Sequence, residues 1–301
     1  MTTPGHHRDE TIDAPAVEAA YLMMSALLAW NGLPSYCNLS DSAFHALKLD
    51  EWDPANFNPA TTTEQSLSCS AVELALMGTN PLFGVRLAYA TWNTTRIHAV
   101  IVGPAGTPYA GGFFHFLLQC PPTYPVDPPH VRHLNTGGNT VSFHPRLYKT
   151  GHVCHSILRT RPGRAWRSWM GIRGVLYALR SLLCQKPYFS RGIMPTEKKE
   201  PLAELYNSVL VHESIRVAVC YAIESCVRRT SRWPPELRAP MLHTFLHHYD
   251  SYVNTVMQKM YLTGRLMVDP LGHTRGLYEF KELLVRLRQL RTDVEDCLSH
   301  M

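Results

Sequence analysis

Cys154 is the residue whose type and surroundings could do chemistry most directly. It lies in the run FHPRLYKTGHVCHSIL, with His144 and Pro145 about ten residues upstream and Trp166 twelve residues downstream. A thiolate is nucleophilic near neutral pH, and a thiol is a far better leaving group than an alcohol. Residues 143–158 show no clean periodicity, which is typical of an irregular connection where function concentrates. The pattern indicates a nucleophile on an extended flap, and the alternative is a buried, inert cysteine.

His152 could influence that thiol. It lies two residues before Cys154, so an extended backbone would place both side chains on one face, with His155 on the opposite face. A protonated His152 would lower the pKa of the thiol from its reference value of about 8.5. The alternative is a solvated loop histidine.

Length and composition bound the remaining chemistry. The chain has 301 residues and a net charge of +5, and its apolar and charged fractions fit a soluble globular protein of one large or two small domains. A mild basic excess does not by itself predict nucleic-acid binding. The eight cysteines include no Cys-x-x-Cys pair, which disfavours a cysteine zinc site and a disulfide scaffold. We expect reduced thiols and a location in the cytoplasm or nucleus.

Two further patterns are expected to carry no chemistry. Gly103-x-x-Gly106 lacks the Gly-Lys-Ser/Thr of a phosphate loop, so we expect no bound nucleotide. His243 and His247 have metal-like spacing, but no third ligand is evident, so no metal site is predicted.

The N-terminal region is heterogeneous. Residues 14–30 are apolar, but four acidic residues precede or interrupt them and no basic stretch stands beside them, which disfavours a signal peptide. The run is too short to span a membrane, and no membrane partner is expected. We predict an N-terminal extension over residues 1–65, either a helix packed on the main domain or a partly disordered arm.

Hydrophobic patterning predicts an α+β chain. The expected elements are a helix at 68–77, strands at 85–92, 96–102, 113–118 and 130–134, and helices at 169–184, 202–228, 236–262 and 278–300. Glycine and proline punctuate the short joins between the strands, which favours an antiparallel meander with its first turn at residues 93–95. We predict a core domain over residues 66–225 and a helical C-terminal extension over residues 226–301.

Four segments around Cys154 match one known family in order and spacing. They are IHAVIVGPAGTPYAGGFFHFLLQCPPTYPVDPPHV, FHPRLYKTGHVC, the tryptophan at position 166, and YALRSLLCQKPY. They resemble the strands and proline-rich turn, the His-Pro-Asn…Cys active-site run, the following tryptophan and the next helix of the ubiquitin-conjugating enzyme (E2) family. Flanking segments resemble a larger family member: Trp52-Asp53-Pro54, Cys69, HESIRVAVC and DPLGHTRG.

This resemblance implies the ubiquitin-conjugating (UBC) fold: an N-terminal helix, a four-stranded antiparallel meander, an active-site flap and C-terminal helices, here with a helical extension. It also implies that Cys154 accepts ubiquitin or a ubiquitin-like modifier from an activating enzyme as a thioester and transfers it to a substrate lysine, often with a ligase. His144 would order the flap rather than act as a base. No cofactor would be bound, since ATP is used by the activating enzyme.

Arg146 is the main departure from the family, which places asparagine at this position. That amide is thought to hold the loop and to steady the oxyanion when lysine attacks. Arginine offers donors but no acceptor. Either the guanidinium substitutes for the amide or catalysis is slow, because losing an oxyanion donor costs about 2.7–4 kcal/mol.

Two other family features are absent. Phe189 aligns with an acidic or serine gate near the incoming lysine, although Ser190 is only one residue away. Residues 70–75 have lost the lysines and arginines with which the family's first helix docks on the activating enzyme. A catalytically weakened UBC-fold scaffold is therefore the alternative to an active enzyme.

The resemblance also places the ligase-binding surface at Pro125 and Val126 in the proline turn and at Trp166 and Arg167 after the cysteine. Arginines surround the second of these loops: Arg159, Arg161, Arg164, Arg167 and Arg173. They form either a solvated basic loop or a surface for an acidic partner or substrate, and nucleic acid is a further, less favoured alternative. A third class, an unrelated cysteine hydrolase, would need a His and an Asn or Asp around Cys154.

Overall fold

The computed structural model describes residues 53, 54, 57, 61–161, 163, 165–192, 194–229 and 233–300. Lys48–Met301 form one compact unit. The helix expected at 14–30 lies outside the described residues, as does most of the extension over 1–65. Within the described part of the chain, no helix is both long and apolar enough to cross a membrane.

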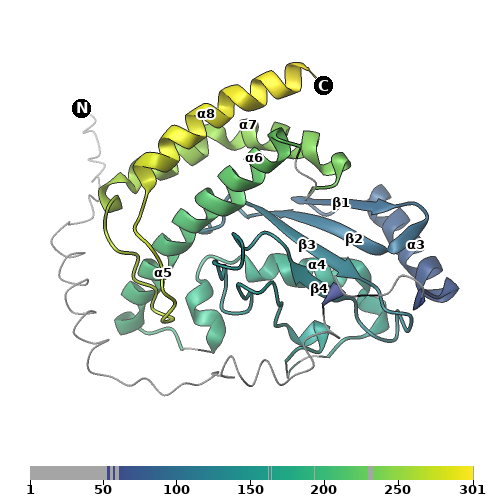
Figure 1. The fold of residues 1–301 in the computed structure, drawn as a ribbon. Coiled ribbons are helices and arrows are strands. Elements are labelled where there is room, and N and C mark those ends of the chain that lie inside the picture. Colours follow the sequence, from purple (N-terminus) through teal and green to yellow (C-terminus); the bar gives the residue numbers. More distant parts are fainter. Residues whose placement is uncertain are drawn as a thin grey trace, which may run out of the picture. The chain divides into compact units, whose positions relative to one another are not determined.

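The predicted α+β order of elements is confirmed (Figure 1). In chain order the main elements are α3 (Glu64–Thr79), β1 (Val85–Ala90), β2 (Asn93–Val102), β3 (Phe113–Gln119), β4 (His130–His133), α4 (Gly171–Leu182), α5 (Glu200–Glu213), α6 (Ala222–Val227), α7 (Pro235–Gln258) and α8 (Phe280–Ser299). The strands form one antiparallel sheet in the order β1-β2-β3-β4, which is the predicted meander.

The turn of the first hairpin was predicted at residues 93–95, but it lies earlier in the chain. Asn93 is already in β2, where it pairs with Ala90, so the turn lies before residue 93. The Asn93 side chain accepts hydrogen bonds from the backbone N–H (3.2 Å) and the hydroxyl (2.7 Å) of Thr95. Thr95 is buried, and a β-branched residue packs well on a pleated surface, so this stretch extends the strand.

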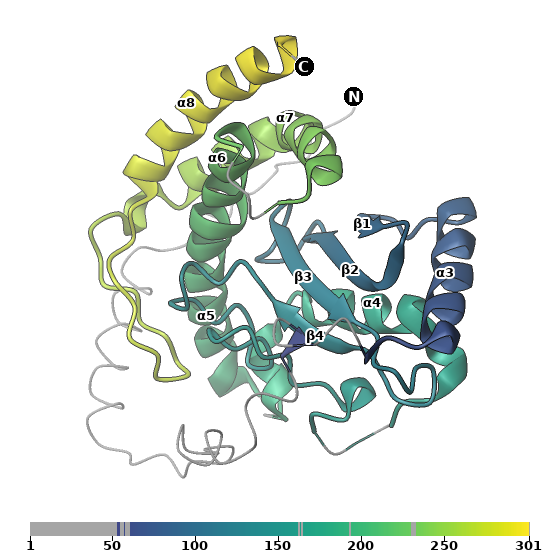
Figure 2. The same cartoon turned by 45° about the vertical axis from the view of Figure 1, so that its right-hand side comes forward.

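The sheet is buried on both faces. Ile97, Phe114 and Phe116 belong to a core with α3, α4 and α5, whereas Val100 and Phe113 belong to a second core with α6, α7 and α8. Figure 2 shows α6 and α7 on one side of the sheet and α4 on the other. All seven residues of β3 are therefore buried, and the strand lacks the apolar–polar alternation of a half-exposed sheet.

One continuous helical segment joins the core to the C-terminal helices. A π-helical stretch, Ser214–Tyr221, connects α5 directly to α6. The predicted division between core and extension at residues 225 and 226 falls inside α6. The extension thus begins without a linker, on a helix that already contacts the sheet through Val217 and Ala218.

Replacing Phe113 with alanine tests whether the second core stabilises the whole fold. Phe113 is fully buried between β3 and the C-terminal helices, so we expect Phe113→Ala to lower the free energy of unfolding by about 3–5 kcal/mol. Urea denaturation measures the change. Phe83→Ala is the control, because Phe83 is 89% exposed and should lose less than about 0.5 kcal/mol. Equal losses would contradict a shared core.

Candidate active site

The flap that carries Cys154 is a chain segment folded back on itself. The backbone N–H of Cys154 donates to the carbonyl of Arg146 (2.9 Å), and that of Tyr148 donates to the carbonyl of His152 (3.0 Å). Gly151 turns the chain between them with φ +92°, and a Cβ there would lie 2.7 Å from the carbonyl oxygen of His133. The turn therefore needs glycine, and it brings the residues before and after it side by side.

Cys154 differs from the core cysteines in its exposure. It is half-buried, whereas Cys120, Cys220 and Cys226 are buried. Burial raises the pKa of Cys220 and of Cys226 to about 12, and it also raises the pKa of Cys120, which leaves these thiols protonated and inert. The Sγ of Cys154 lies 3.8 Å from the carbonyl oxygen of Thr160.

The chain after Cys154 is fixed by short-range hydrogen bonds. Thr160 Oγ1 accepts from the backbone N–H of His155 (2.8 Å) and lies 2.9 Å from the carbonyl oxygen of Val153. The ring Nδ1 of His155 accepts from the N–H of Ile157 (3.2 Å) and caps the 3-10 turn Ser156–Leu158. These bonds hold the sulfur between two ordered pieces of chain.

His144 orders the flap from inside the core. It is buried, and its Nδ1 accepts from the backbone N–H of Arg146 (3.0 Å). Burial, reinforced by the charge of Arg146, lowers the pKa of His144 to about 3. The ring is therefore neutral at pH 7 with its proton on Nε2, an arrangement that suits the structural role predicted for it.

His152 matches neither prediction made for it. It is buried rather than solvated, with its ring 5.8 Å from that of Tyr148. Burial lowers the pKa of His152 to about 4, so it carries no charge at pH 7 that could stabilise the thiolate of Cys154. His152 forms an isolated antiparallel β-bridge with Arg132 of β4, so the backbone of the flap lies along the edge of the sheet here. This pairing places the ring of His152 in the interior.

Arg146 ties the flap to the loop that follows α4. Its Nη2 donates to the carbonyl of Ser190 (2.7 Å), in the 3-10 segment Pro187–Arg191. Its Nε–H is buried and has no hydrogen-bond partner among the described residues. Burial and the nearby charge of Arg161 lower the pKa of Arg146, but a guanidinium remains protonated in proteins. The site thus holds a fixed positive charge whose buried Nε–H is not committed to a hydrogen bond within the described residues.

The segment at the predicted gate offers packing rather than a carboxylate. Phe189 packs against the first core. Ser190 gives its carbonyl to Arg146, and its Oγ lies 4.0 Å from the Sγ of Cys184. Residues 184–192 contain no acidic side chain. Arg146 therefore contacts the segment where the resemblance expected a gate.

The four residues predicted for ligase binding differ in their exposure to solvent. Trp166 is only 4% exposed, and its Nε1 donates to the carbonyl of Pro125 (2.9 Å). Val126 is 63% exposed and Arg167 is exposed. The sequence reasoning missed Trp169, which was placed in an apolar helix but is 82% exposed in the turn Ser168–Met170. Trp166 orders this surface, and Val126, Arg167 and Trp169 are available on it.

Glu73 is a second residue that sequence reasoning missed. One of its carboxylate oxygens accepts from the hydroxyl of Tyr124 (2.6 Å), and the other accepts from the backbone N–H of Ile172 (2.6 Å). It therefore joins α3, the proline turn and the start of α4. The partners are 51 and 99 residues away, so no local pattern could indicate them.

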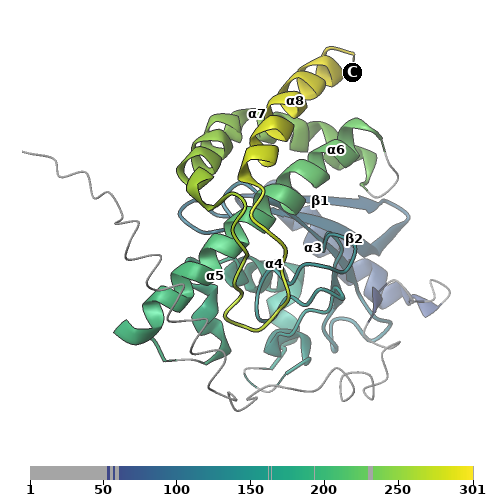
Figure 3. The same cartoon turned by 60° about the vertical axis from the view of Figure 1, so that its left-hand side comes forward.

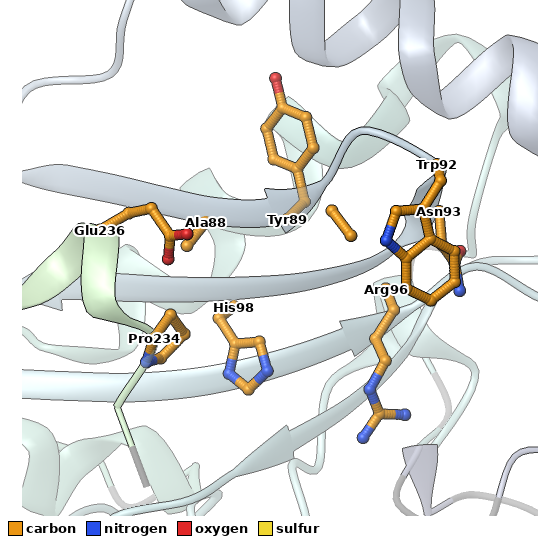
Figure 4. Close-up of a pocket in the computed structure, with 9 residues that line it drawn as sticks. Ala88, Tyr89, Trp92, Asn93, Arg96, His98, Pro234 and Glu236 are labelled. Atoms are coloured by element: carbon orange, nitrogen blue, oxygen red, sulfur yellow. The ribbon is translucent and has the colours of Figure 1, made fainter. Parts of the chain in front are cut away.

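A separate pocket of about 240 Å³ lies where β1 and β2 meet the start of α7 (Figure 4). Its wall includes Tyr89, Trp92, Arg96, His98 and Glu236, and it includes no flap residue. In the described chain no group of three or more His, Cys, Asp or Glu side chains is arranged to hold a metal ion.

The comparisons with known proteins agree with this architecture. A family model described as "Ubiquitin-conjugating enzyme" matches residues 70–200. The chain belongs to the ubiquitin-conjugating enzyme family, and it has the UBC fold. Ubiquitin-conjugating enzyme E2 Z from Homo sapiens is 37% identical over 279 residues, which cover 92% of this chain and 77% of that protein.

Two further relatives extend this likeness. E2 Z from Xenopus tropicalis is 34% identical over 288 residues, covering 94% of this chain and 90% of its own. E2 Z from Danio rerio is 36% identical over 261 residues, covering 87% and 78%. The similarity includes the C-terminal helices, because the matched lengths far exceed the family model's range.

Buried histidines should make stability depend on pH. Burial lowers the pKa of His133, His144 and His152 below the unfolded value of 6.5, to about 4, 3 and 4. The unfolded chain therefore binds more protons below pH 6.5, and stability is lost as the pH falls. For each histidine, we expect the free energy of unfolding to drop by about 0.7 kcal/mol between pH 7 and 6 and by about 1.2 kcal/mol between pH 6 and 5, as measured by urea denaturation.

His133→Phe provides the control for this pH dependence, because the ring stacks on Phe116 and phenylalanine can keep that contact. The variant should lose about one histidine's share of the slope. A free energy of unfolding that stays constant from pH 7 to pH 5 would show that these rings are not held neutral.

Proposed function

We propose that the chain is an active ubiquitin-conjugating enzyme with Cys154 as its nucleophile. The observation that carries the proposal is a half-buried thiol on an ordered flap, beside an arginine with an uncommitted donor. Family membership supports ubiquitin, an activating enzyme, a ligase and protein substrates as general partners. The protein would work in the cytoplasm or nucleus and bind no cofactor, with ATP consumed by the activating enzyme.

The reaction would proceed in two acyl transfers. The Cys154 thiolate attacks the carbonyl carbon of the thioester at the modifier's C-terminal glycine, a C–S bond forms, and the activating enzyme's thiolate leaves. A neutral lysine amine then attacks the new thioester, the C–S bond to Cys154 breaks, and an amide forms. The amine's extra proton passes to solvent, and the Cys154 thiolate is released.

The site residues would have distinct tasks in these steps. Arg146 would offer its guanidinium to the oxyanion that forms when lysine attacks, in place of the family's asparagine. His144, which is neutral and buried, would hold the backbone of Arg146 in place through its Nδ1. Phe189 would contribute an apolar wall that limits water near the thioester.

Thioester formation tests the proposal directly. The protein is incubated with activating enzyme, ATP and ubiquitin or a ubiquitin-like modifier, and is run on a non-reducing gel. We expect an adduct that thiols remove, and Cys154→Ser should convert it into a thiol-resistant ester, because serine forms an oxygen ester. Cys297→Ser, at a half-buried thiol on α8, should form the same adduct as the unmodified chain. Absence of an adduct with every modifier would support the scaffold alternative.

Arg146→Asn tests how the unusual arginine affects the second transfer. If its guanidinium steadies the oxyanion, discharge to free lysine should slow, and complete loss of the donor in Arg146→Ala should slow it by about 10²–10³-fold. Single-turnover chase of the preformed thioester measures the rate. A faster discharge in Arg146→Asn would identify arginine as the cause of slow catalysis. Unchanged rates in both variants would exclude both roles.

A further inference from the structure

The segment between α7 and α8 crosses from one core to the other. We call residues 266–277 the strap. It is closed by a bridge between Leu266 and Leu277 and by a hydrogen bond from the N–H of Met267 to the carbonyl of Gly276 (2.9 Å). Figure 3 shows it running away from α7 and α8 and alongside α5. Leu271, near its tip, packs against the core between the sheet and α3, α4 and α5.

A buried ion pair shapes the strap. Arg275 Nη2 lies 2.9 Å from Asp269 Oδ2, and the two side chains are only 4% and 0% exposed. The other oxygen of Asp269 accepts from the backbone N–H of Leu271 (2.8 Å). Burying two charges costs free energy that their attraction only partly returns, so stability alone is a poor explanation for the pair.

The ion pair is directed at the active-site flap. Arg275 Nη2 also donates to the carbonyl of Ser142 (3.1 Å), 133 residues away in sequence. The Oγ of Ser142 accepts from the backbone N–H of Lys149, inside the flap (2.9 Å). The next carbonyl, that of Phe143, accepts from the hydroxyl of Tyr109 (2.6 Å). The two residues before His144 are therefore held by three side-chain hydrogen bonds, and the one from Arg275 comes from the extension.

A contact from α7 reaches the same region. Tyr252 donates its hydroxyl hydrogen to the carbonyl of Gly111 (2.8 Å). A Cβ on Gly111 would lie 2.6 Å from the Tyr252 ring, so only glycine allows this approach. Gly111 is two residues from Tyr109, which bonds to the flap base at Phe143. The helix α7 is thus linked to the base of the flap through Gly111 and Tyr109.

We propose that the strap positions the active site, with Arg275 as a positioning residue that fixes the base of the flap through Ser142. The inference rests on the proposed function, because the flap carries Cys154 and Arg146, and it gives the C-terminal extension a catalytic purpose. The flap pairs the backbone of Cys154 with that of Arg146, while the Arg146 guanidinium is bonded to Ser190 outside the flap, so a shift at the flap base would change the position of the sulfur relative to the guanidinium. Misplacement of reacting groups by about 1 Å can cost 10²-fold in rate.

The test variant removes the donor without leaving a buried charge. Asp269→Asn with Arg275→Met keeps a side-chain oxygen for Leu271 but removes both charges and the bond to Ser142. The control is Glu224→Gln with Arg286→Met, which removes the ion pair between α6 and α8 (2.8 Å) and touches no flap residue; its side chains are 22% and 36% exposed, so it controls for the loss of an ion pair on α8 away from the flap. Thermal unfolding of both double variants shows that each is folded before it is assayed.

Two measurements follow the flap. In single-turnover discharge from the Cys154 thioester, we expect the test variant's rate at saturating lysine to fall by about 10- to 100-fold, with the apparent KM for lysine unchanged. Alkylation of Cys154 by iodoacetamide, read by peptide mass spectrometry across pH 6–10, should change in rate and in midpoint. The control variant should match the unmodified chain in both.

Discharge and alkylation equal to those of the control would overturn the proposal. If the double variant does not fold, Arg275→Lys replaces it, since lysine keeps the charge beside Asp269 but has no guanidinium fork to reach Ser142 as well. An unchanged discharge rate and alkylation profile in Arg275→Lys would then overturn the proposal. If the unmodified chain accepts no modifier, the proposed function fails, while alkylation still decides whether the strap positions the flap.

Discussion

Burial of the sheet on both faces is the constraint on which the rest of the structure depends. β3 contributes Phe114, Phe116 and Leu118 to a core with α3, α4 and α5, and Phe113 to a core with α6, α7 and α8. Neither helical layer can be removed without exposing apolar strand residues to water, which costs roughly 25 cal/mol for each Å². The C-terminal helices are therefore part of the folded unit, and the strap between them is anchored well enough to reach the flap.

The sheet also orders the active site, because the flap is hydrogen-bonded to its last strand, β4. β4 carries the backbone that meets the flap, since Arg132 bridges His152 and the N–H of His133 donates to the carbonyl of Gly151 (2.8 Å). Buried neutral histidines fill the space beneath, and Arg146 closes the far side through Ser190. The chemistry then depends on one half-exposed sulfur in a setting that is otherwise fixed. The charge beside that sulfur is an arginine's, because His152 is neutral and residues 184–192 contain no carboxylate.

The sequence predicted the parts of the fold that depend on local pattern. The strand order was confirmed, as were the helices expected at 169–184, 202–228, 236–262 and 278–300, except that Trp169 lies in the 3-10 turn before α4. The family resemblance led to the flap. Local pattern gave wrong predictions for polar residues whose environment depends on contacts distant in sequence. Thr95 is buried and belongs to β2, and His152 is buried where its backbone bridges Arg132. The contacts of Glu73, Arg146 and Arg275 span 99, 44 and 133 residues, and no periodicity encodes such pairings.

Intact-mass spectrometry of the protein after incubation with activating enzyme, ATP and a ubiquitin-like modifier tests the central claim most directly. The account predicts a mass gain of one modifier less one water, mapped to Cys154 and lost when free lysine is added, with lysine–modifier conjugate formed in equal amount. A chain that gains no mass at Cys154 with any such modifier, although iodoacetamide still alkylates that thiol, would contradict the account.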